Sequence, residues 1–276
     1  NWMPVAHYNG GHEHNTRHLI YSRFWHHALY DLGLVNTAEP YARRTAQGLL
    51  MGNDGYKMSK SRGNGFMVAD LVASVGADAG RVAVLSLGPW ENNVVWTDGA
   101  MAGVQRFLKR VENLSDNLTD APMTAEQERL MNQLIADVTE RIDGMRFNTA
   151  ISAMMEYLNA FSGGTMPRAA YVALVRVLNP FAPHLTEEMW EKLGNDTMLA
   201  VSDWPTYDAS KLAKTEMTVV ASVNGKRAAE FTIAVGASES EIVDAARAAA
   251  GAKLSGCEII KTIVVPNKLV NFVVKK

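Results

Sequence analysis

The segment Lys57-Met58-Ser59-Lys60-Ser61 is the first candidate for chemistry, because it places two lysines three residues apart in a loop bounded by glycines. Both ammonium groups of such a loop can face one anionic ligand, and the small hydroxyl residues leave room for a phosphate chain. Cations held in this way stabilise the negative charge that develops on phosphates during displacement at phosphorus. A solvated basic loop is the alternative, which the lysine pair by itself favours.

A second candidate lies upstream, in the run Gly10-Gly11-His12-Glu13-His14 and in His18. The two glycines allow a ligand to approach the backbone closely. His14 and His18 are four residues apart, so on a helix they would share one face near its start. Histidines this dense also suggest zinc, but a zinc peptidase motif needs a glutamate directly after the first histidine, and here Glu13 precedes it. We therefore expect no protein-bound zinc or other metal ligated by these residues.

The composition excludes several classes of protein. The chain has 276 residues, of which 47% are hydrophobic and 20% charged, and a formal net charge of −2, so it is not an intrinsically disordered chain. No apolar run reaches the ~18 residues that a membrane-spanning helix needs. A single cysteine, Cys257, excludes a disulfide framework, and we expect a cytoplasmic protein with no membrane partner. Because the sequence opens on Asn1, we also expect a piece of a longer protein.

Charge is distributed unevenly along the chain. Residues 1–63 carry 7 Lys/Arg and 4 Asp/Glu (net +3), residues 100–200 carry 9 and 13 (net −4), and residues 217–276 carry 8 and 5 (net +3). Two basic ends suit contacts with a polyanion. Ordinary scatter of surface charge explains counts this small equally well.

The candidate residues need elements to position them, and the hydrophobic pattern predicts three domains. In residues 1–97, helices over about 15–32, 69–74 and 78–87, the last capped by Asp78, alternate with a strand and turn over 48–55, which is typical of an α/β layer. Residues 98–200 are expected to form five helices with short connections, which favours an antiparallel bundle. After a polar linker over 201–216, residues 217–276 follow a period of two around a hairpin turn and one helix, which predicts a ββαββ module.

These motifs resemble those of the class I aminoacyl-tRNA synthetases, whose signature loop is the string found at Lys57–Ser61. The run Gly10–His14 with His18 is similar to the corresponding segment of leucyl-tRNA synthetases, and differs from that of isoleucyl and valyl enzymes. Further matches follow in order along the chain. They include Gly88-Pro89, Phe147-Asn148-Thr149-Ala150, Leu178-Asn179-Pro180-Phe181-Ala182-Pro183-His184 and Val223-Asn224-Gly225-Lys226. The resemblance is to the C-terminal part of a leucyl-tRNA synthetase: a partial Rossmann-like half-domain, an all-α bundle of the anticodon-binding type, and a small α+β module.

The resemblance implies that leucine is activated by ATP, with Mg²⁺ bound to the ATP, and is then transferred to tRNA(Leu). Lys57 and Lys60 match catalytic residues that grip the ATP phosphates, and Glu13 matches the residue that holds the ATP ribose. His14 and His18 match residues that line the pocket for L-leucine. The other residues implied in ATP binding are Gly10, Gly11, Met58, Ser59 and Ser61. In the last domain the residues implied in tRNA binding are Lys226, Arg227, Lys261 and Lys268, with ordinary surface cations as the alternative.

The resemblance is incomplete, because the family's other ATP-binding motif, His-Ile-Gly-His, and its editing domain do not occur in this sequence. Half of an active site cannot align the reacting atoms, so we expect the chain alone to make no leucyl-adenylate. We also expect a monomer, with a lysine loop that is mobile without ATP. The alternative function is a non-catalytic tRNA-binding module or a truncated paralogue. Another nucleotidyl transferase with the same loop is disfavoured, because the bundle (residues 98–200) and the ββαββ module (residues 217–276) also resemble those of leucyl-tRNA synthetases.

Overall fold

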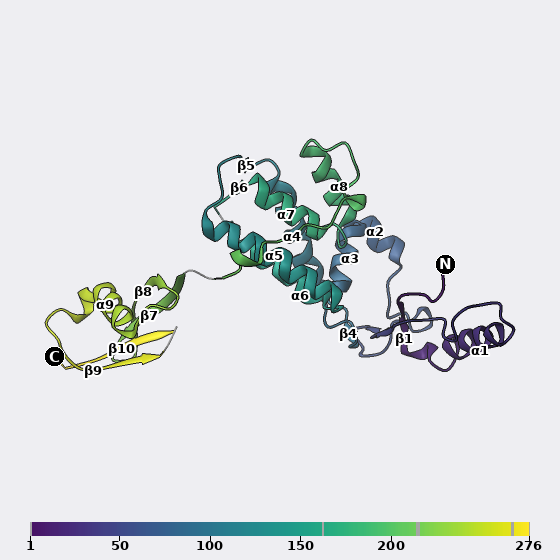
Figure 1. The fold of residues 1–276 in the computed structure, drawn as a ribbon, viewed down its shortest axis with the longest axis horizontal. Helices are drawn as coiled ribbons and strands as arrows, with labels where there is room; N and C mark the ends of the chain where they lie inside the picture. Colours follow the sequence, from purple (N-terminus) through teal and green to yellow (C-terminus); the bar gives the residue numbers. More distant parts are fainter. Residues whose placement is uncertain (1, 162, 214–215, 266–267, 276) are drawn as a thin grey trace. The chain divides into compact units, whose positions relative to one another are not determined.

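The computed structural model describes residues 2–161, 163–213, 216–265 and 268–275, which belong to two compact units (Figure 1). Unit 1 is Asn1–Asp208 and unit 2 is Ala209–Lys276, and each has its own hydrophobic core. The domain division predicted after residue 97 falls inside unit 1. Residue 1 of the predicted first domain, residue 162 of the predicted bundle, residues 214–215 of the predicted linker, and residues 266–267 and 276 of the predicted last domain lie outside the described residues. Among the described residues, no helix is both long and apolar enough to cross a membrane.

Unit 1 begins with a β-α-β arrangement. Strand β1 (Tyr8–Gly11) pairs in parallel with β2 (Arg44–Gln47), and helix α1 (His18–Asp31) lies between them in the chain. A second parallel pair joins β3 (Leu50–Met51) to β4 (Val94–Val95). The sequence pattern did not predict β1 or β2, because both are rich in polar and small residues. Pairing with a partner strand, and not intrinsic propensity, makes them strands.

Helix α1 has an apolar stripe that its own unit leaves exposed. Ile20, Phe24 and Trp25 recur at helical spacing, yet they are 57%, 75% and 66% exposed. The buried residues of this helix are Leu19 and His26. The periodicity therefore predicted the helix correctly, but it does not indicate which face of α1 is buried here.

The predicted cap at Asp78 is wrong. Helix α2 (Val68–Val75) is followed by α3 (Ala77–Ser86), whose N-cap residue is Gly76, with φ 86° and no side-chain hydrogen bond. Instead, the Asp78 carboxylate accepts a hydrogen bond from the Leu185 N–H at 2.7 Å and lies 2.8 Å from His184 Nδ1. Both residues belong to the first turn of α8 (Pro183–Lys192), so Asp78 caps a helix about a hundred residues away.

Among the described residues of unit 1, five helices form the bundle, as predicted: α4 (Asp98–Leu114), α5 (Ala125–Asp143), α6 (Phe147–Asn159), α7 (Arg168–Leu178) and α8. The side chain of Asp98 is not described. Thr124 forms the predicted capping box with Gln127 at the start of α5. Met154, Met166 and Met189 are almost fully buried in the core, which confirms that these methionines fill the core. A short strand pair, β5 (Leu118–Thr119) with β6 (Met166–Pro167), and a 3₁₀ turn, η3 (Leu199–Val201), complete the unit.

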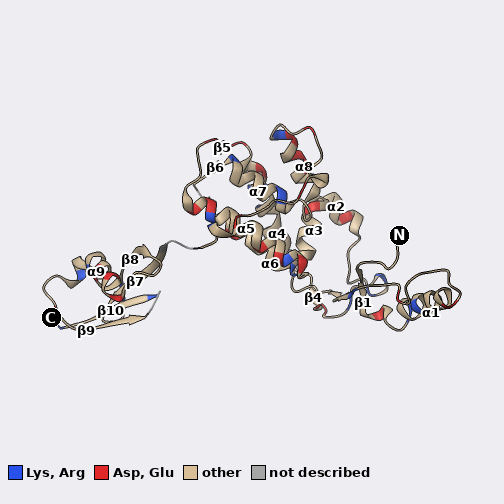
Figure 2. Cartoon of the chain, viewed as in Figure 1, with Lys and Arg blue, Asp and Glu red and all other residues tan. Residues whose placement is uncertain are grey.

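Acidic and basic residues occur on the same helices of the bundle (Figure 2). Two ion pairs show the interlacing: Arg141 lies 3.2 Å from Asp137, and Arg146 lies 2.7 Å from Glu140. The negative charge of the middle region is therefore partly compensated locally.

Unit 2 has the predicted ββαββ order of elements. After the 3₁₀ turn η4 (Ala209–Lys211), its elements are β7 (Glu216–Val223), β8 (Lys226–Ala234), α9 (Glu239–Ala249), the short α10 (Gly251–Leu254), β9 (Glu258–Val265) and β10 (Leu269–Lys275). The strands form one sheet in the order β8-β7-β10-β9, in which β7 and β10 are parallel. Asn224 and Gly225 both have positive φ, as the predicted hairpin turn requires. Ser238 forms the second predicted capping box, with Glu241.

Candidate functional site

An ion pair joins the two candidate segments of the sequence. Lys57 Nζ lies 2.9 Å from Glu13 Oε1, although the two residues are 44 positions apart in the chain. The side chains are 56% and 43% exposed, so water screens their attraction. The hydrogen bond from Lys57 is the main reason that the pKa of Glu13 lies below its usual value.

The elements around the ion pair explain how these side chains meet. Strand β1 ends at Gly11, and the 3₁₀ turn η1 (His12–His14) then carries Glu13. A Cβ atom added at Gly11 would lie only 2.3 Å from Glu13 Oε2, so a side chain at this position would displace the carboxylate. On the other side, Lys57 forms a β-bridge with Met51, which fixes the start of the lysine loop against β3.

A hollow of about 360 Å³ adjoins the ion pair. Glu13 and Lys57 are the charged residues among those that line it; the remainder are Gln47, Gly48, Leu49, Leu50, Val84, Leu85, Gly88, Pro89, Trp90, Asn92, Val94 and Phe147. The rings of Trp90 and Phe147 meet edge to face at 5.3 Å. An apolar hollow with a few convergent polar groups has the character of a small-molecule site.

Lys60 does not share this hollow. It opens the 3₁₀ turn η2 (Lys60–Arg62), which Gly63 ends with φ 64°. Within the described part of the chain Lys60 forms no ion pair, and the neighbouring Ser59 and Ser61 hydroxyls lie 3.3 Å apart. Met58 packs against the core of unit 1. The structure therefore brings Lys57, but not Lys60, to Glu13.

The expectation that His14 and His18 share a helix face is wrong. His14 ends η1 and His18 begins α1, and between them Arg17 has φ −123° and ψ −97°, which is not helical. His18 instead lies among aromatic rings: its centroid is 5.4 Å from that of Tyr8, and its Nε2 is 3.4 Å from the Tyr41 hydroxyl. The rule of four-residue spacing fails because it assumes a continuous helix.

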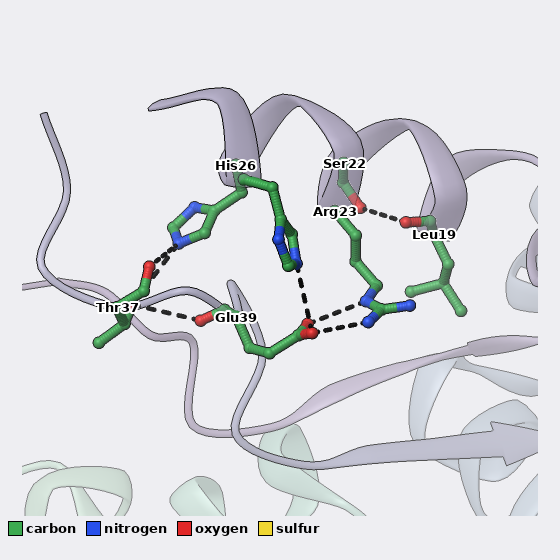
Figure 3. Close-up of polar contacts among 7 residues, drawn as sticks. Leu19, Ser22, Arg23, His26, Thr37 and Glu39 are labelled. Carbon is green, nitrogen blue, oxygen red and sulfur yellow. Dashed lines mark hydrogen bonds and ion pairs between the residues drawn. The ribbon is translucent and has the colours of Figure 1, made fainter. Parts of the chain in front are cut away.

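Polar contacts also join α1 to the segment before Tyr41, at Thr37 and Glu39 (Figure 3). The Arg23 guanidinium donates to both carboxylate oxygens of Glu39, at 2.9 and 2.6 Å, and lowers the pKa of Glu39 to about 2. His26 is buried, with its Nε2 2.8 Å from the Thr37 carbonyl oxygen. These contacts hold the segment that leads into Tyr41 and strand β2 in place against α1.

Several residues near the site were missed by sequence reasoning. Tyr8 and Tyr41 surround His18, and their own rings lie 4.6 Å apart. Asp54 and Asn64 flank the lysine loop and bond to each other. The sequence carries only a weak signal that Asp54 and Asn64 contact the lysine loop. Asp54 lies in a run of residues that indicates a turn, and Asn64 directly follows Gly63.

In unit 2, the four predicted tRNA-binding residues occupy different surfaces. Arg227 pairs with Ser222 in the sheet, and Lys261 pairs with Val273. Side chains alternate along strands, so Arg227 and Lys261 lie on the sheet face opposite the buried Val219, Ala221, Val270 and Phe272, which pack with α9. Lys226 lies one position from Arg227, at the β7–β8 hairpin, and Lys268 lies in the β9–β10 turn.

Two family models match separate ranges of the chain. Residues 20–96 match the family model described as tRNA synthetases class I (I, L, M and V), and residues 128–243 match the anticodon-binding domain of tRNA ligase. A leucine–tRNA ligase of Chlorobium phaeobacteroides (strain BS1) is 41% identical over 284 residues, which cover 99% of this chain. The chain spans about a third (35%) of the length of that curated relative.

Solved structures give the same result. The agnB2 LeuRS of Agrobacterium radiobacter K84, solved as a ternary complex with tRNA and LeuAMS, matches with a TM-score of 0.70 at 29% identity, over 99% of this chain and 38% of that one. Methionyl-tRNA synthetase of Mycobacterium tuberculosis bound by methionyl-adenylate shares the fold, with a TM-score of 0.52 at 18% identity over 70% of this chain and 45% of that one. The chain therefore belongs to the leucine–tRNA ligase family of class I tRNA synthetases.

Proposed function

We propose that the complete gene product is a leucine–tRNA ligase, and that this chain carries its lysine loop and part of its ATP and leucine sites. The observation that carries this proposal is the 2.9 Å contact between Lys57 and Glu13, because it unites two distant motifs beside one hollow. The family membership of the chain supports the same function.

In the proposed reaction, a carboxylate oxygen of leucine attacks the α-phosphorus of ATP. A new oxygen–phosphorus bond forms, the bond to the β-phosphate breaks, and pyrophosphate leaves with the displaced electron pair. Lys57 and Lys60 stabilise the charge that develops on the phosphates. Glu13 accepts hydrogen bonds from the ribose hydroxyls, so its contact with Lys57 opens when ATP binds. A hydroxyl oxygen of the terminal ribose of tRNA(Leu) then attacks the leucyl carbonyl carbon, the bond between that carbon and the phosphate oxygen breaks, and AMP leaves.

The other site residues have supporting roles in this proposal. Gly10, Gly11, Met58, Ser59 and Ser61 shape the ATP site, and His14 and His18 contact the leucine side chain. Among the described residues, no group of three or more His, Cys, Asp or Glu side chains could hold a metal ion. Mg²⁺ often binds mainly through substrate phosphates, so in our proposal it enters with ATP and is held by the phosphate chain.

Leucine-dependent exchange between ATP and pyrophosphate tests the proposal. The complete gene product should catalyse this exchange, and Lys60→Ala should reduce its rate by about 100-fold, as expected for the loss of one cation that stabilises the transition state. The 276-residue chain alone should show no exchange above its own Lys60→Ala control. Exchange by the isolated chain would contradict the proposed division of the active site.

A non-catalytic tRNA-binding module is the second candidate, because residues 128–243 match an anticodon-binding domain. Aminoacylation of tRNA(Leu) separates the two functions. A complete gene product that binds tRNA(Leu) but transfers no leucine to it would support the second function and overturn the first.

A further inference from the structure

Asn64 contacts the lysine loop from its C-terminal side. Its Oδ1 accepts a hydrogen bond from the Ser59 N–H at 2.9 Å, within the loop. Its Nδ2 donates toward the carbonyl oxygens of Lys57 and Tyr56, at 3.3 and 3.4 Å. One amide side chain thus bonds the backbone on both sides of Met58.

Asp54 contacts Asn64 from the N-terminal side of the loop. Asn64 Nδ2 lies 3.0 Å from Asp54 Oδ1 and 2.9 Å from Oδ2, and the Tyr56 N–H donates to Oδ1 at 3.0 Å. These hydrogen bonds, that from Asn64 first, hold the pKa of Asp54 below its usual value, with a minor contribution from Arg62. The carboxylate is therefore ionised, and remains an acceptor, at neutral pH.

Gly52 leaves the space that this pair needs. A Cβ atom at Gly52 would lie 2.9 Å from Asp54 Oδ1 and 3.1 Å from Asn64 Nδ2. The backbone that follows β3 thus approaches the pair closely, and hydrogen bonds fasten the two ends of the loop to each other. We call Asp54 and Asn64 the loop clamp.

We propose that the loop clamp positions Lys57 and Lys60 for phosphate, an inference that rests on the proposed phosphate-binding role of the lysine loop. A flexible loop loses conformational entropy when it orders around a ligand, and that loss weakens binding. The clamp removes part of this loss in advance, because it fixes the backbone between the two lysines before the ligand arrives. This inference replaces the expectation of a loop that is mobile without ATP. Asp54 and Asn64 touch no reacting atom in this role, and they act through the loop.

The sign of the charge effect distinguishes the clamp from simple electrostatics. Asp54 is an anion beside a proposed phosphate site, so by Coulomb attraction alone its removal would strengthen anion binding. If the clamp operates, Asp54→Ala weakens anion binding although it removes a negative charge. Asp70→Ala is a matched control, because it removes an exposed carboxylate in α2 that lies outside the clamp.

The test uses tripolyphosphate, which has neither ribose nor leucine, and measures its binding to the 276-residue chain by calorimetry at fixed ionic strength. Asn64→Ala and Asp54→Ala should each weaken binding by about fivefold or more. Asp70→Ala should bind as tightly as the unmodified chain or more tightly. Asn53→Ala is the control for Asn64, because Asn53 is an amide next to Asp54 in the turn before the loop but, among the described residues, forms no side-chain hydrogen bond.

A second measurement follows the loop without any ligand. Hydrogen exchange at the Ser59 amide should accelerate by about tenfold in Asn64→Ala, since that amide loses its acceptor. The melting temperatures of Asn64→Ala and Asn53→Ala should agree, because the clamp lies outside the core. Unchanged tripolyphosphate affinity in both clamp variants, or unchanged Ser59 exchange, would overturn the clamp alone. Failure of the unmodified chain to bind tripolyphosphate would overturn the phosphate role of the loop, and this inference with it.

Discussion

The Glu13 carboxylate is held by two different effects. Gly11 leaves the space in which the carboxylate lies against the backbone, and Lys57 supplies the opposite charge. The contact with Lys57 is solvated, and exposed ion pairs of this kind contribute little to stability. Such a contact is easily exchanged for a ligand, as the proposed ATP site requires.

The ion pair between Arg23 and Glu39 gives a prediction about pH. The pKa of Glu39 is lowered from 4.5 to about 2, mainly by the hydrogen bonds from Arg23. A carboxylate with a depressed pKa adds stability above its unfolded pKa and loses that contribution as the pH falls through the folded pKa. We therefore expect the Glu39 carboxylate to stay ionised and bound to Arg23 at pH 4 and to be protonated only near pH 2, as followed by NMR titration of the carboxyl carbon. The stability that the contact adds should decline between about pH 4.5 and pH 2.

Arg23→Gln should raise the pKa of Glu39 toward 4.5, the ordinary value for a glutamate. Arg43→Gln is the control, because Arg43 is exposed and, within the described chain, forms no ion pair. A Glu39 that titrates near its ordinary pKa in the unmodified chain would show that the contact is absent in solution.

Among the elements, α3 and α8 are joined through one buried carboxylate. Asp78 is 8% exposed, and it satisfies a first-turn N–H of α8 that has no partner within its own helix. This contact links the segment that follows the lysine loop to the last helix of the bundle. A carboxylate at a helix N-terminus is also favoured by the helix dipole.

Asp78→Ala should lower the free energy of unfolding of unit 1 by about 1–2 kcal/mol, the usual cost of losing a helix cap. All six tryptophans lie in unit 1, so tryptophan fluorescence during urea unfolding follows this unit. Asp70→Ala, which removes an exposed carboxylate, should change the free energy by less than about 0.5 kcal/mol. Equal effects of the two variants would mean that Asp78 does not cap α8.

For the whole molecule, the proposed partner is tRNA(Leu), and if the basic residues of unit 2 contact its phosphates, we expect its binding to be sensitive to salt. Arg227 and Lys261 share one face of the sheet on its two edge strands, three strand spacings (about 14 Å) apart across the sheet and two residues (about 7 Å) apart along it. Arg227 also forms an ion pair with Glu230, which partly neutralises it.

Replacing Arg227 and Lys261 together by glutamine should weaken tRNA(Leu) binding to the chain. It should also reduce the slope of log affinity against log salt by about 1–2, because each cation that contacts a phosphate releases counterions. The matched control replaces Arg247 in α9 and Lys253 in α10, two exposed cations outside the predicted tRNA-binding set, and so removes the same charge elsewhere in the unit. A filter-binding titration over a range of salt concentrations measures both the affinity for tRNA(Leu) and its dependence on salt. If the control pair changes the slope equally, the sheet face is not the RNA surface.

The elements that were predicted correctly depend on local backbone preferences. The capping boxes at Thr124 and Ser238, the Asn224-Gly225 hairpin and the period-two strands of unit 2 all formed as expected. In each case the residues that set the conformation are neighbours in the chain, so the free energy that decides the structure is encoded in a few positions.

The sequence by itself determined the helices and hairpins, the string Lys57–Ser61 and the resemblance that it carries. Only the tertiary structure decided that Glu13 meets Lys57, that Asp78 caps α8 and not its own helix, and that η1 separates His14 from His18. The reason is that a polar side chain takes the strongest hydrogen-bond partner in space, and a contact between distant segments outweighs the small differences in local propensity. Those partners exist only after the chain has folded.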